Sequence, residues 1–161
     1  MKTAQVLVVA FILVMAGSCY LGYTPPGVGV VIVLLSMVAF FLYARDKAAA
    51  IAGTWRISEK TLHMASLFGG WPGALVAQQR LRHKTKKTSF RAVFWVTVLA
   101  NMVLIGWLHS PHGNAQLRYG FGKVENVMVF SARNESILSA LHLLTAFRCD
   151  GVWIRPDQSC P

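Results

Sequence analysis

Long apolar runs separated by short polar segments dominate the chain. The first run, from residue 3 to residue 44, holds 42 residues without a formal charge, and a second, from residue 92 to residue 117, holds 26. A helix needs about 20 mainly apolar residues to cross a bilayer. The pattern therefore predicts an all-α membrane protein with three transmembrane helices, at about residues 4–23, 27–44 and 91–109.

The first of these segments has a second interpretation. Lys2 followed by an apolar run and then by the small residues Ala16, Gly17 and Ser18 is also the pattern of a cleaved signal peptide. A retained span is the interpretation that we follow, with the proline pair at residues 25–26 breaking the chain before the second span begins.

Residues 61–79 form another uncharged stretch, which glycine and proline interrupt at its centre. A glycine pair ends a helix, and proline suits the first turn of the next one. A continuous span would also place the basic residues that flank the stretch on opposite sides of the membrane. We therefore predict a cytoplasmic re-entrant or interfacial helical hairpin, with a full span as the alternative. The predicted structural turn consists of Gly69, Gly70, Pro72 and Gly73.

Composition agrees with this class, and the placement of charge adds a topology. Hydrophobic residues make up 55% of the chain and charged residues only 14%, against about a quarter in soluble domains. The formal net charge is +10, and residues 45–91 hold ten of the 16 Lys and Arg against two acids. Cytoplasmic loops of membrane proteins retain Lys and Arg. We therefore expect residues 45–91 to be cytoplasmic and the tail, residues 111–161, to be external to a membrane domain at residues 1–110.

Three local signals refine the helices. Gly53 favours a helix end after Ala52, and Ser58 suits the N-cap of the next helix, with Glu59 in its first turn. Asn101 is polar in the middle of the last predicted span, which indicates a hydrogen bond between helices.

The two acids of the basic segment, Asp46 and Glu59, lie among bases next to predicted helix ends. An unpaired carboxylate near a bilayer is costly, so each is expected to have a basic partner. One interpretation is a structural ion-pair network that fixes the hairpin to the spans. The other is a pocket for an anionic headgroup or a phosphate. The candidate ligand-binding residues are Asp46, Lys47, Arg56, Glu59, Arg82, His83, Lys84, Thr85 and Lys87.

The tail has a less definite pattern. The pattern of residues 110–123 is typical of a loop, whereas residues 136–147 repeat apolar residues at helical spacing and suit a membrane surface. Cys149 and Cys160 are candidates for a disulfide if the tail faces an oxidising compartment.

Strong catalytic signatures are missing from the sequence, which has no Walker loop, Cys-x-x-Cys, His-Glu-x-x-His or Gly-x-Ser-x-Gly motif. His109 and His112 are three residues apart, but Pro111 favours a turn between them, so we expect no metal site and no cofactor. Whether the protein is an enzyme stays open, with the balance against it. The enzyme alternative uses His83 and Glu59 as acid–base groups on a lipid or a phosphate-bearing substrate.

Nucleic acid is a further alternative partner. The segment from residue 80 to residue 91 holds six Lys and Arg with Thr and Ser between them, but it has little aromatic surface for stacking on bases. A membrane-tethered nucleic-acid-binding protein is therefore the least favoured interpretation.

Residues 43–90 resemble the DUF1294 family of small bacterial membrane proteins. Four pieces carry the resemblance in order, namely YARDKAAA, WRISEKTLH, FGGWPGA and RHKTKKTSF. The resemblance implies an inner-membrane location in a bacterium and a few membrane helices, and it implies no activity. The residues that it carries over are Asp46, Lys47, Arg56, Glu59, Gly69, Gly70, Gly73, Arg82, His83, Lys84 and Phe90.

The leading hypothesis is thus a multi-pass inner-membrane protein whose basic cytoplasmic face binds anionic lipid headgroups or a partner. Juxtamembrane Lys and Arg contribute about 1 kcal/mol each near an anionic leaflet. Membrane lipids are the expected ligands, and the sequence does not indicate which protein partner, if any, is bound.

Overall fold

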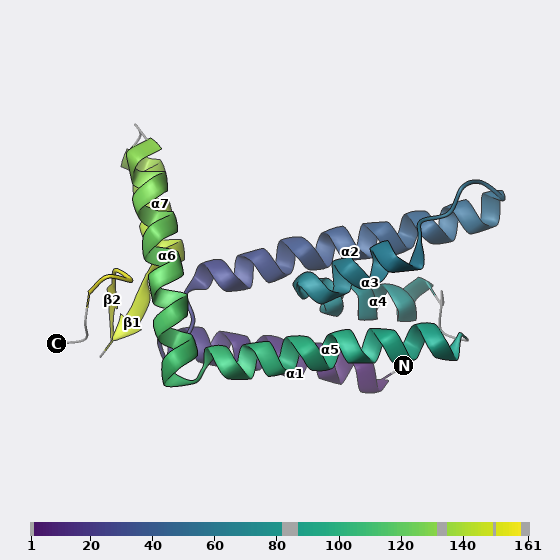
Figure 1. The fold of residues 1–161 in the computed structure, drawn as a ribbon, viewed down its shortest axis with the longest axis horizontal. Helices are drawn as coiled ribbons and strands as arrows, with labels where there is room; N and C mark the ends of the chain where they lie inside the picture. The colour runs from purple at the N-terminus through teal and green to yellow at the C-terminus, as the bar shows by residue number, and fades with distance from the viewer. Residues whose placement is uncertain (1, 82–86, 132–134, 150, 159–161) are drawn as a thin grey trace. The chain divides into compact units, whose positions relative to one another are not determined.

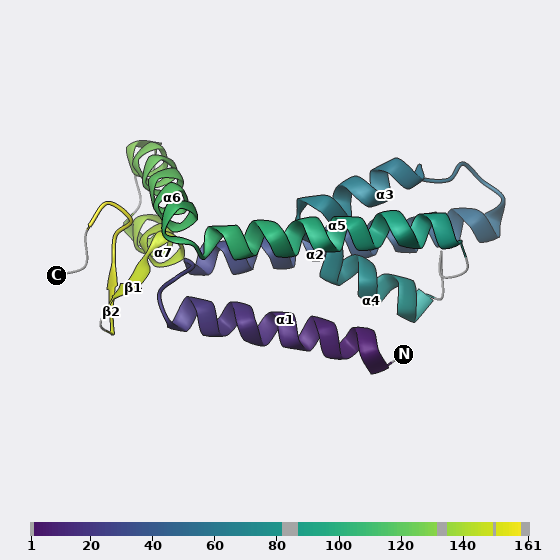
Figure 2. The same cartoon turned by 60° about the horizontal axis from the view of Figure 1, so that its bottom comes forward.

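A computed structural model describes residues 2–81, 87–131, 135–149 and 151–158. It is mainly helical (Figures 1 and 2), and a two-stranded antiparallel sheet closes the described chain. The elements in order are α1 (Lys2–Tyr20), α2 (Pro26–Ala52), α3 (Glu59–Ala65), η1 (Ser66–Gly70), α4 (Trp71–Leu81), α5 (Thr88–Leu108), α6 (Pro111–Ser131), α7 (Glu135–Thr145), β1 (Phe147–Cys149) and β2 (Val152–Ile154).

The chain forms two compact units. The hairpin unit contains Met1–Ala10 and Val31–Leu104, and the tail unit contains Phe11–Val30 and Ile105–Pro161. The hairpin unit thus holds most of α2 and α5 with α3, η1 and α4. The tail unit holds α6, α7 and the sheet together with the turn between α1 and α2.

Within the described residues, two helices are long and apolar enough to cross a membrane, namely α2 and α5. The apolar part of α1, Gln5–Tyr20, is shorter than these two, so the third predicted span stays a prediction. Helix α2 also continues eight residues beyond its predicted end at residue 44. It stops where Gly53 has a φ of 66° and the Thr54 amide donates to the Ala49 carbonyl at 3.1 Å, which is the glycine-dependent helix end that the sequence indicated.

Helices α3 and α4 form a bent hairpin beside α2 and α5 (Figure 2). The Ser58 hydroxyl caps α3 by accepting from the Thr61 amide at 3.2 Å, as predicted. The regular helical backbone is then interrupted by a kink at Gly69, whose φ of 106° only glycine adopts without strain. This kink excludes one continuous helix over residues 61–79 and supports the predicted turn.

Two further glycines of the turn allow η1 and α4 to pack directly on the backbone of α2. A Cβ atom on Gly73 would lie 1.8 Å from the Ser36 carbonyl oxygen, and one on Gly70 would lie 2.7 Å from the Leu35 carbonyl oxygen. Ala74 and Ala77 of α4 are completely buried as well. Small residues therefore let these helices approach closely.

Helix α5 covers the other side of the hairpin with one face. Its buried residues, Phe90, Phe94, Thr97, Val98 and Asn101, follow helical spacing. The Asn101 amide donates to the Leu67 carbonyl at 3.0 Å, and more distantly to Ser66, inside the kinked segment. Asn101 thus makes the predicted bond between helices.

Replacing Asn101 with leucine is expected to lower the free energy of unfolding by about 1 kcal/mol, because two buried carbonyls in the kink lose a donor while side-chain volume is nearly kept. Thermal unfolding in detergent measures the change. Met102→Leu, on the exposed side of the same helix, is the matched control. Equal melting temperatures for the two variants would contradict this role for Asn101.

The tail unit corrects the expectation of a loop at residues 110–123, because these residues belong to α6. Pro111 occupies the first turn, where a proline needs no amide partner, and the Ser110 hydroxyl accepts from the Gly113 amide at 3.2 Å as an N-cap. The predicted helix at residues 136–147 is present as α7, and the sheet that follows had no signal in the sequence analysis.

Polar contacts join α6 to α7 and to β1. The buried Glu125 carboxylate accepts from the Thr145 hydroxyl at 3.1 Å and pairs with the His142 ring. The Arg118 guanidinium lies 4.2 Å from the centre of the Phe147 ring, and burial lowers the pKa of Arg118 from its ordinary value. Cys149 is disulfide-bonded, and Cys160, its predicted partner, lies outside the described residues.

Candidate functional site

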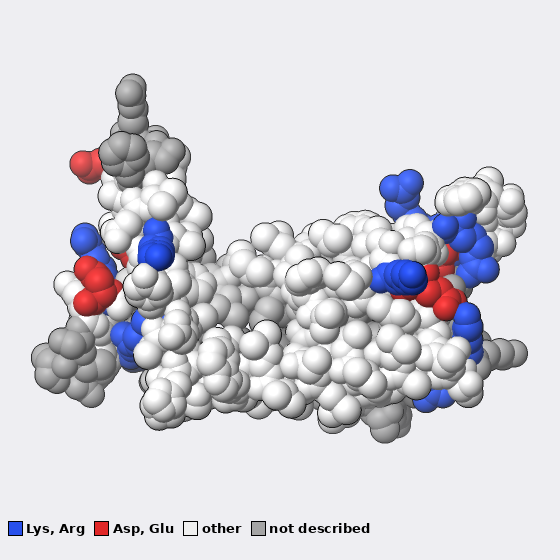
Figure 3. Space-filling model, viewed as in Figure 1, with Lys and Arg blue, Asp and Glu red and all other residues white. Residues whose placement is uncertain are grey.

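The candidate site lies at one end of the hairpin unit, where α2 ends and α3 and α5 begin. Figure 3 shows Lys, Arg, Asp and Glu gathered at this end, while the rest of the visible face of the unit carries no charge. A 27-residue helix is about 40 Å long, and the hydrocarbon core of a bilayer is about 30 Å thick. The last turns of α2, which carry Asp46, therefore have the length to emerge from a bilayer that α2 crosses.

Asp46 is the most deeply buried charge of this end, with a completely buried side chain. The Nε atom of Arg56 lies 3.6 Å from the Asp46 Oδ1 atom, and the Arg56 side chain is 49% exposed. The loop after α2 therefore brings Arg56 back to a carboxylate that lies six residues before the end of the helix. This pair fits the prediction that each acid has a basic partner.

One turn before Asp46, Tyr43 connects α2 to the hairpin. Its side chain is completely buried, and its hydroxyl accepts from the Gln78 side-chain amide at 3.3 Å and interacts with Ser66. The Ser66 hydroxyl also donates to the Leu62 carbonyl at 2.9 Å. Buried polar groups from α2, η1 and α4 thus satisfy one another beside Asp46.

Aromatic contacts connect the same region to α5. The rings of His63 and Phe90 lie 4.3 Å apart between centres, and the edge of Phe90 meets Tyr43 at 6.2 Å. Phe90 is 1% exposed, so it packs in the core of the hairpin unit at the start of α5. This residue ends the motif RHKTKKTSF, which the sequence analysis singled out mainly for its charge.

The second acid, Glu59, is paired at the surface. Its Oε2 atom lies 2.8 Å from the Lys87 Nζ atom, and the two side chains are 35% and 56% exposed. This ion pair links the start of α3 to the residue before α5. Exposed pairs of this kind contribute about 0–1 kcal/mol, so it fixes the geometry more than it stabilises the fold.

The structure thus brings together five of the nine candidate ligand-binding residues at one end of the hairpin unit. Lys47 lies half-buried on α2 next to Asp46, while Arg56, Glu59 and Lys87 form the two ion pairs. The other four, Arg82, His83, Lys84 and Thr85, lie outside the described residues.

Sequence reasoning missed four residues of this region, namely Tyr43, His63, Ser66 and Gln78. A tyrosine near the end of a predicted span is typical of the membrane interface rather than of a core. A signal was available for Tyr43 and Gln78, because Tyr43 is one turn from Asp46 and Gln78 follows Gly70 and Ala74 at helical spacing. His63 and Ser66 gave no such signal, since only the fold brings them to Phe90 and Tyr43.

The chemistry available here is mainly electrostatic. The described residues at this end include six exposed bases, Arg45, Arg56, Lys60, Arg80, Lys87 and Arg91. Two of them, Arg56 and Lys87, pair with the buried acid and the surface acid. Among the described residues, no group of three His, Cys, Asp or Glu side chains is placed to hold a metal ion. The arrangement offers positive charge to an anion at the surface, above a rigid hydrogen-bonded core.

Comparison with known proteins agrees with this division of the chain. Residues 36–90 match the family described as "Protein of unknown function (DUF1294)". The chain is also similar to "Uncharacterized protein YsdA" of Bacillus subtilis (strain 168), with 32% identity over 80 residues that cover 50% of this chain and 90% of the relative. No solved structure matches the chain. The family match ends at Phe90, as the sequence analysis expected, and begins seven residues earlier, at Ser36. The chain belongs to the DUF1294 family.

Proposed function

We propose that this protein is an integral protein of the bacterial inner membrane whose charged end, residues 45–91, faces the cytoplasm and binds anionic phospholipid headgroups. The observation that carries the proposal is that, on the visible face of the hairpin unit, the charged residues gather at one end of two exposed apolar helices. In a bilayer, that end meets the headgroups while the apolar surface meets the acyl chains.

The exposed apolar surface of α2 and α5 supports insertion. Only 17% of the apolar window of α2 and 22% of that of α5 are buried within the protein, whereas a core helix of a soluble protein is mostly buried. Leu34 and Phe41 on α2 and Val96 and Leu99 on α5 are more than half exposed. Contact with water costs about 25 cal/mol for each Å² of such surface, and contact with lipid removes this cost.

Two features of the tail support an external location for it. Cys149 is disulfide-bonded, and disulfides persist in oxidising compartments outside the cytoplasm. The charges after residue 117 also nearly balance, with five Lys and Arg against four acids, whereas cytoplasmic loops carry an excess of bases.

The two alternative functions have less support among the described residues. Glu59, the acid–base candidate of the enzyme alternative, is engaged by Lys87 at 2.8 Å. His83, its predicted partner, lies outside the described residues. The nucleic-acid alternative lacks a row of aromatic side chains among the described bases on which nucleotides would stack.

The topology predicts a specific labelling pattern in cells. Alkaline phosphatase fused to the C-terminus of the full chain is expected to be active, because the tail lies outside. Thr54→Cys, in the exposed loop after α2, is expected to react with a membrane-impermeant maleimide in inverted vesicles and not in intact cells. The parent chain is the control for the native cysteines, and the reverse pattern would overturn the proposal.

Headgroup binding has its own test by native mass spectrometry of the purified protein. We expect more phosphatidylglycerol than phosphatidylcholine to be retained, and we expect added salt to reduce the difference. Lys60→Gln and Arg91→Gln should each weaken retention up to about fivefold, corresponding to about 1 kcal/mol per base. If charge alone is responsible, Arg82→Lys should leave retention unchanged. Equal retention of the two lipids would contradict headgroup binding.

A further inference from the structure

The first turn of helix α6 packs at very short distance against the last residues of α5. A Cβ atom on Gly113 would lie 2.1 Å from the Trp107 carbonyl oxygen and 2.8 Å from the Leu108 Cα atom. Only a glycine permits this approach. Ser110, the N-cap of α6, also donates its hydroxyl proton to the Trp107 carbonyl at 2.6 Å. The first turn of α6 is therefore held against the last residues of the predicted span.

The same helix is held against the turn that joins α1 to α2. The Asn114 side-chain amide donates to the Tyr23 carbonyl at 2.6 Å. Further along α6, the Phe121 ring lies 3.4 Å from the position of a Cβ atom on Gly27, in the first turn of α2. Helix α6 thus passes beside two chain segments at which predicted spans start or end.

Three faces of α6 have different environments. Arg118 and Glu125 face β1 and α7. His112, Tyr119, Lys123 and Asn126 lie on an exposed face of the helix and are mostly polar. The third face carries Leu117, Phe121 and Val124 at the i, i+4 and i+7 positions of an apolar stripe.

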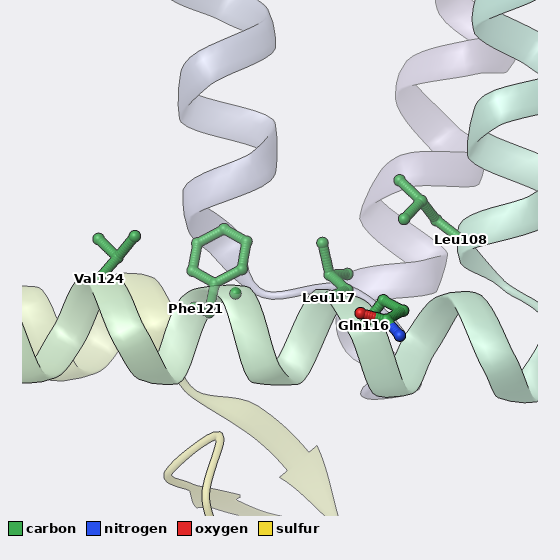
Figure 4. A pocket seen from close by; sticks show the side chains of 6 residues that line it. Leu108, Gln116, Leu117, Phe121 and Val124 are labelled. Atoms are coloured by element: carbon green, nitrogen blue, oxygen red, sulfur yellow. The ribbon is translucent and has the colours of Figure 1, made fainter.

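The apolar stripe lines a pocket of about 330 Å³, together with Leu108, Gln116 and Gly120. In Figure 4, Leu117, Phe121 and Val124 extend from the side of α6 that faces the first turn of α2, and Leu108 lies at the end of α5. The pocket therefore opens in the corner between α6 and the ends of the apolar helices. A lipid that packs against α5 at Leu108 would therefore also contact this pocket, because Leu108 is one of its lining residues.

We infer that α6 lies in the external membrane interface and that the Leu108–Phe121–Val124 pocket holds an acyl chain of a phospholipid. The inference rests on the proposed function, because it requires α5 to cross the bilayer. If α5 leaves the hydrocarbon at Leu108, a helix that starts three residues later is within the interfacial region. An interfacial helix buries its apolar side among the acyl chains and keeps its polar side in water.

Spin labels separate the inference from the proposal on which it rests. Single labels are placed at Leu99, in the middle of α5, at Val124, on the apolar stripe, and at Asn126, on the exposed face of α6, with the full chain in phosphatidylglycerol nanodiscs. We expect the labels at 99 and 124 to be accessible to oxygen and protected from a water-soluble nickel chelate. The label at 126 should show the opposite.

Each other outcome is decisive. A label at 99 that the nickel chelate reaches overturns the proposed function. If the label at 99 is in lipid, two results for the label at 124 overturn the inference alone. Access of the nickel chelate to position 124 would show that the pocket faces solvent, and protection of position 124 from both reagents would show that it faces protein.

Filling the pocket tests its occupant. Gly120→Leu places a side chain in the pocket at a position with no atom within 4 Å, and Gly106→Leu is the matched control on α5, also with open space and outside the pocket. We expect Gly120→Leu to lose one retained phospholipid in native mass spectra, and Gly106→Leu to keep it. Unchanged retention in a folded Gly120→Leu variant overturns acyl-chain binding.

Discussion

Gly73→Ala is expected to destabilise the hairpin unit by about 3 kcal/mol or more, the largest effect of any single methyl group that we predict. The added Cβ atom would lie 1.8 Å from the carbonyl oxygen of Ser36, 2.5 Å from its carbonyl carbon and 2.7 Å from its Cα atom. All three are backbone atoms of α2, so no change of side-chain rotamer relieves the overlap. Overpacking in a core that can adjust costs about 1–3 kcal/mol, and here α4 must move away from α2.

Thermal unfolding of the purified protein in detergent, followed by circular dichroism, measures this loss. Gly106→Ala is the matched control, because it is also a helical glycine and has no atom within 4 Å of the new Cβ position. Alanine is favoured over glycine in a helix by about 1 kcal/mol, so the control should unfold at the same temperature or slightly above it. Equal stability of the two variants would show that α4 does not pack on the backbone of α2.

The glycine cluster shows how much of the hairpin could be predicted from the sequence. The cluster from Gly69 to Gly73 predicted a break in a stretch with the composition of a span, and the kink at Gly69 is present. The sequence could not identify the partner of Gly73, because Ser36 is one of many residues in an apolar helix and only the fold selects it.

The pattern of charges predicted where the candidate site lies, but it did not predict which residues are buried inside the site. Asp46 and Glu59 were expected to find bases, and Arg56 and Lys87 meet them. The interior of the site depends on Tyr43, which composition alone assigns to a membrane interface. Its burial is a consequence of contacts with Gln78 and Phe90, from elements 35 and 47 residues away in the chain.

The tail was predicted least well, and the reason is physical. Pro111 and Gly113 are unfavourable within a helix interior, so a pattern based on propensity favours a loop. In the structure, Pro111 occupies the first turn, where it is tolerated, and Gly113 is required by the contact with the Trp107 carbonyl. Contacts made in the folded protein determine that both residues lie in the first turn of a helix, and local sequence patterns carry no information about these contacts.

Asp46→Asn is expected to lower the free energy of unfolding by about 2–3 kcal/mol, because it removes a buried charge from its ion pair. The substitution keeps the shape of the side chain, so no cavity contributes to the loss. The side chain at position 46 is completely buried, so ions in solution do not reach it. The loss should therefore persist at high ionic strength, where mobile ions screen exposed charges but not buried ones.

Glu59→Gln is the matched control for Asp46→Asn, since Glu59 is the other acid of this end and is also paired with a base. Its partner Lys87 is 56% exposed, so loss of this ion pair should lower the free energy of unfolding by less than about 1 kcal/mol. This difference should disappear in high salt. Melting temperatures of both variants at low and high salt distinguish the two cases. If the two acids respond alike, Asp46 is not a structural charge. If they differ as predicted, the ion pair of Asp46 holds the end of α2 in place, and headgroup binding is left to the exposed bases around it.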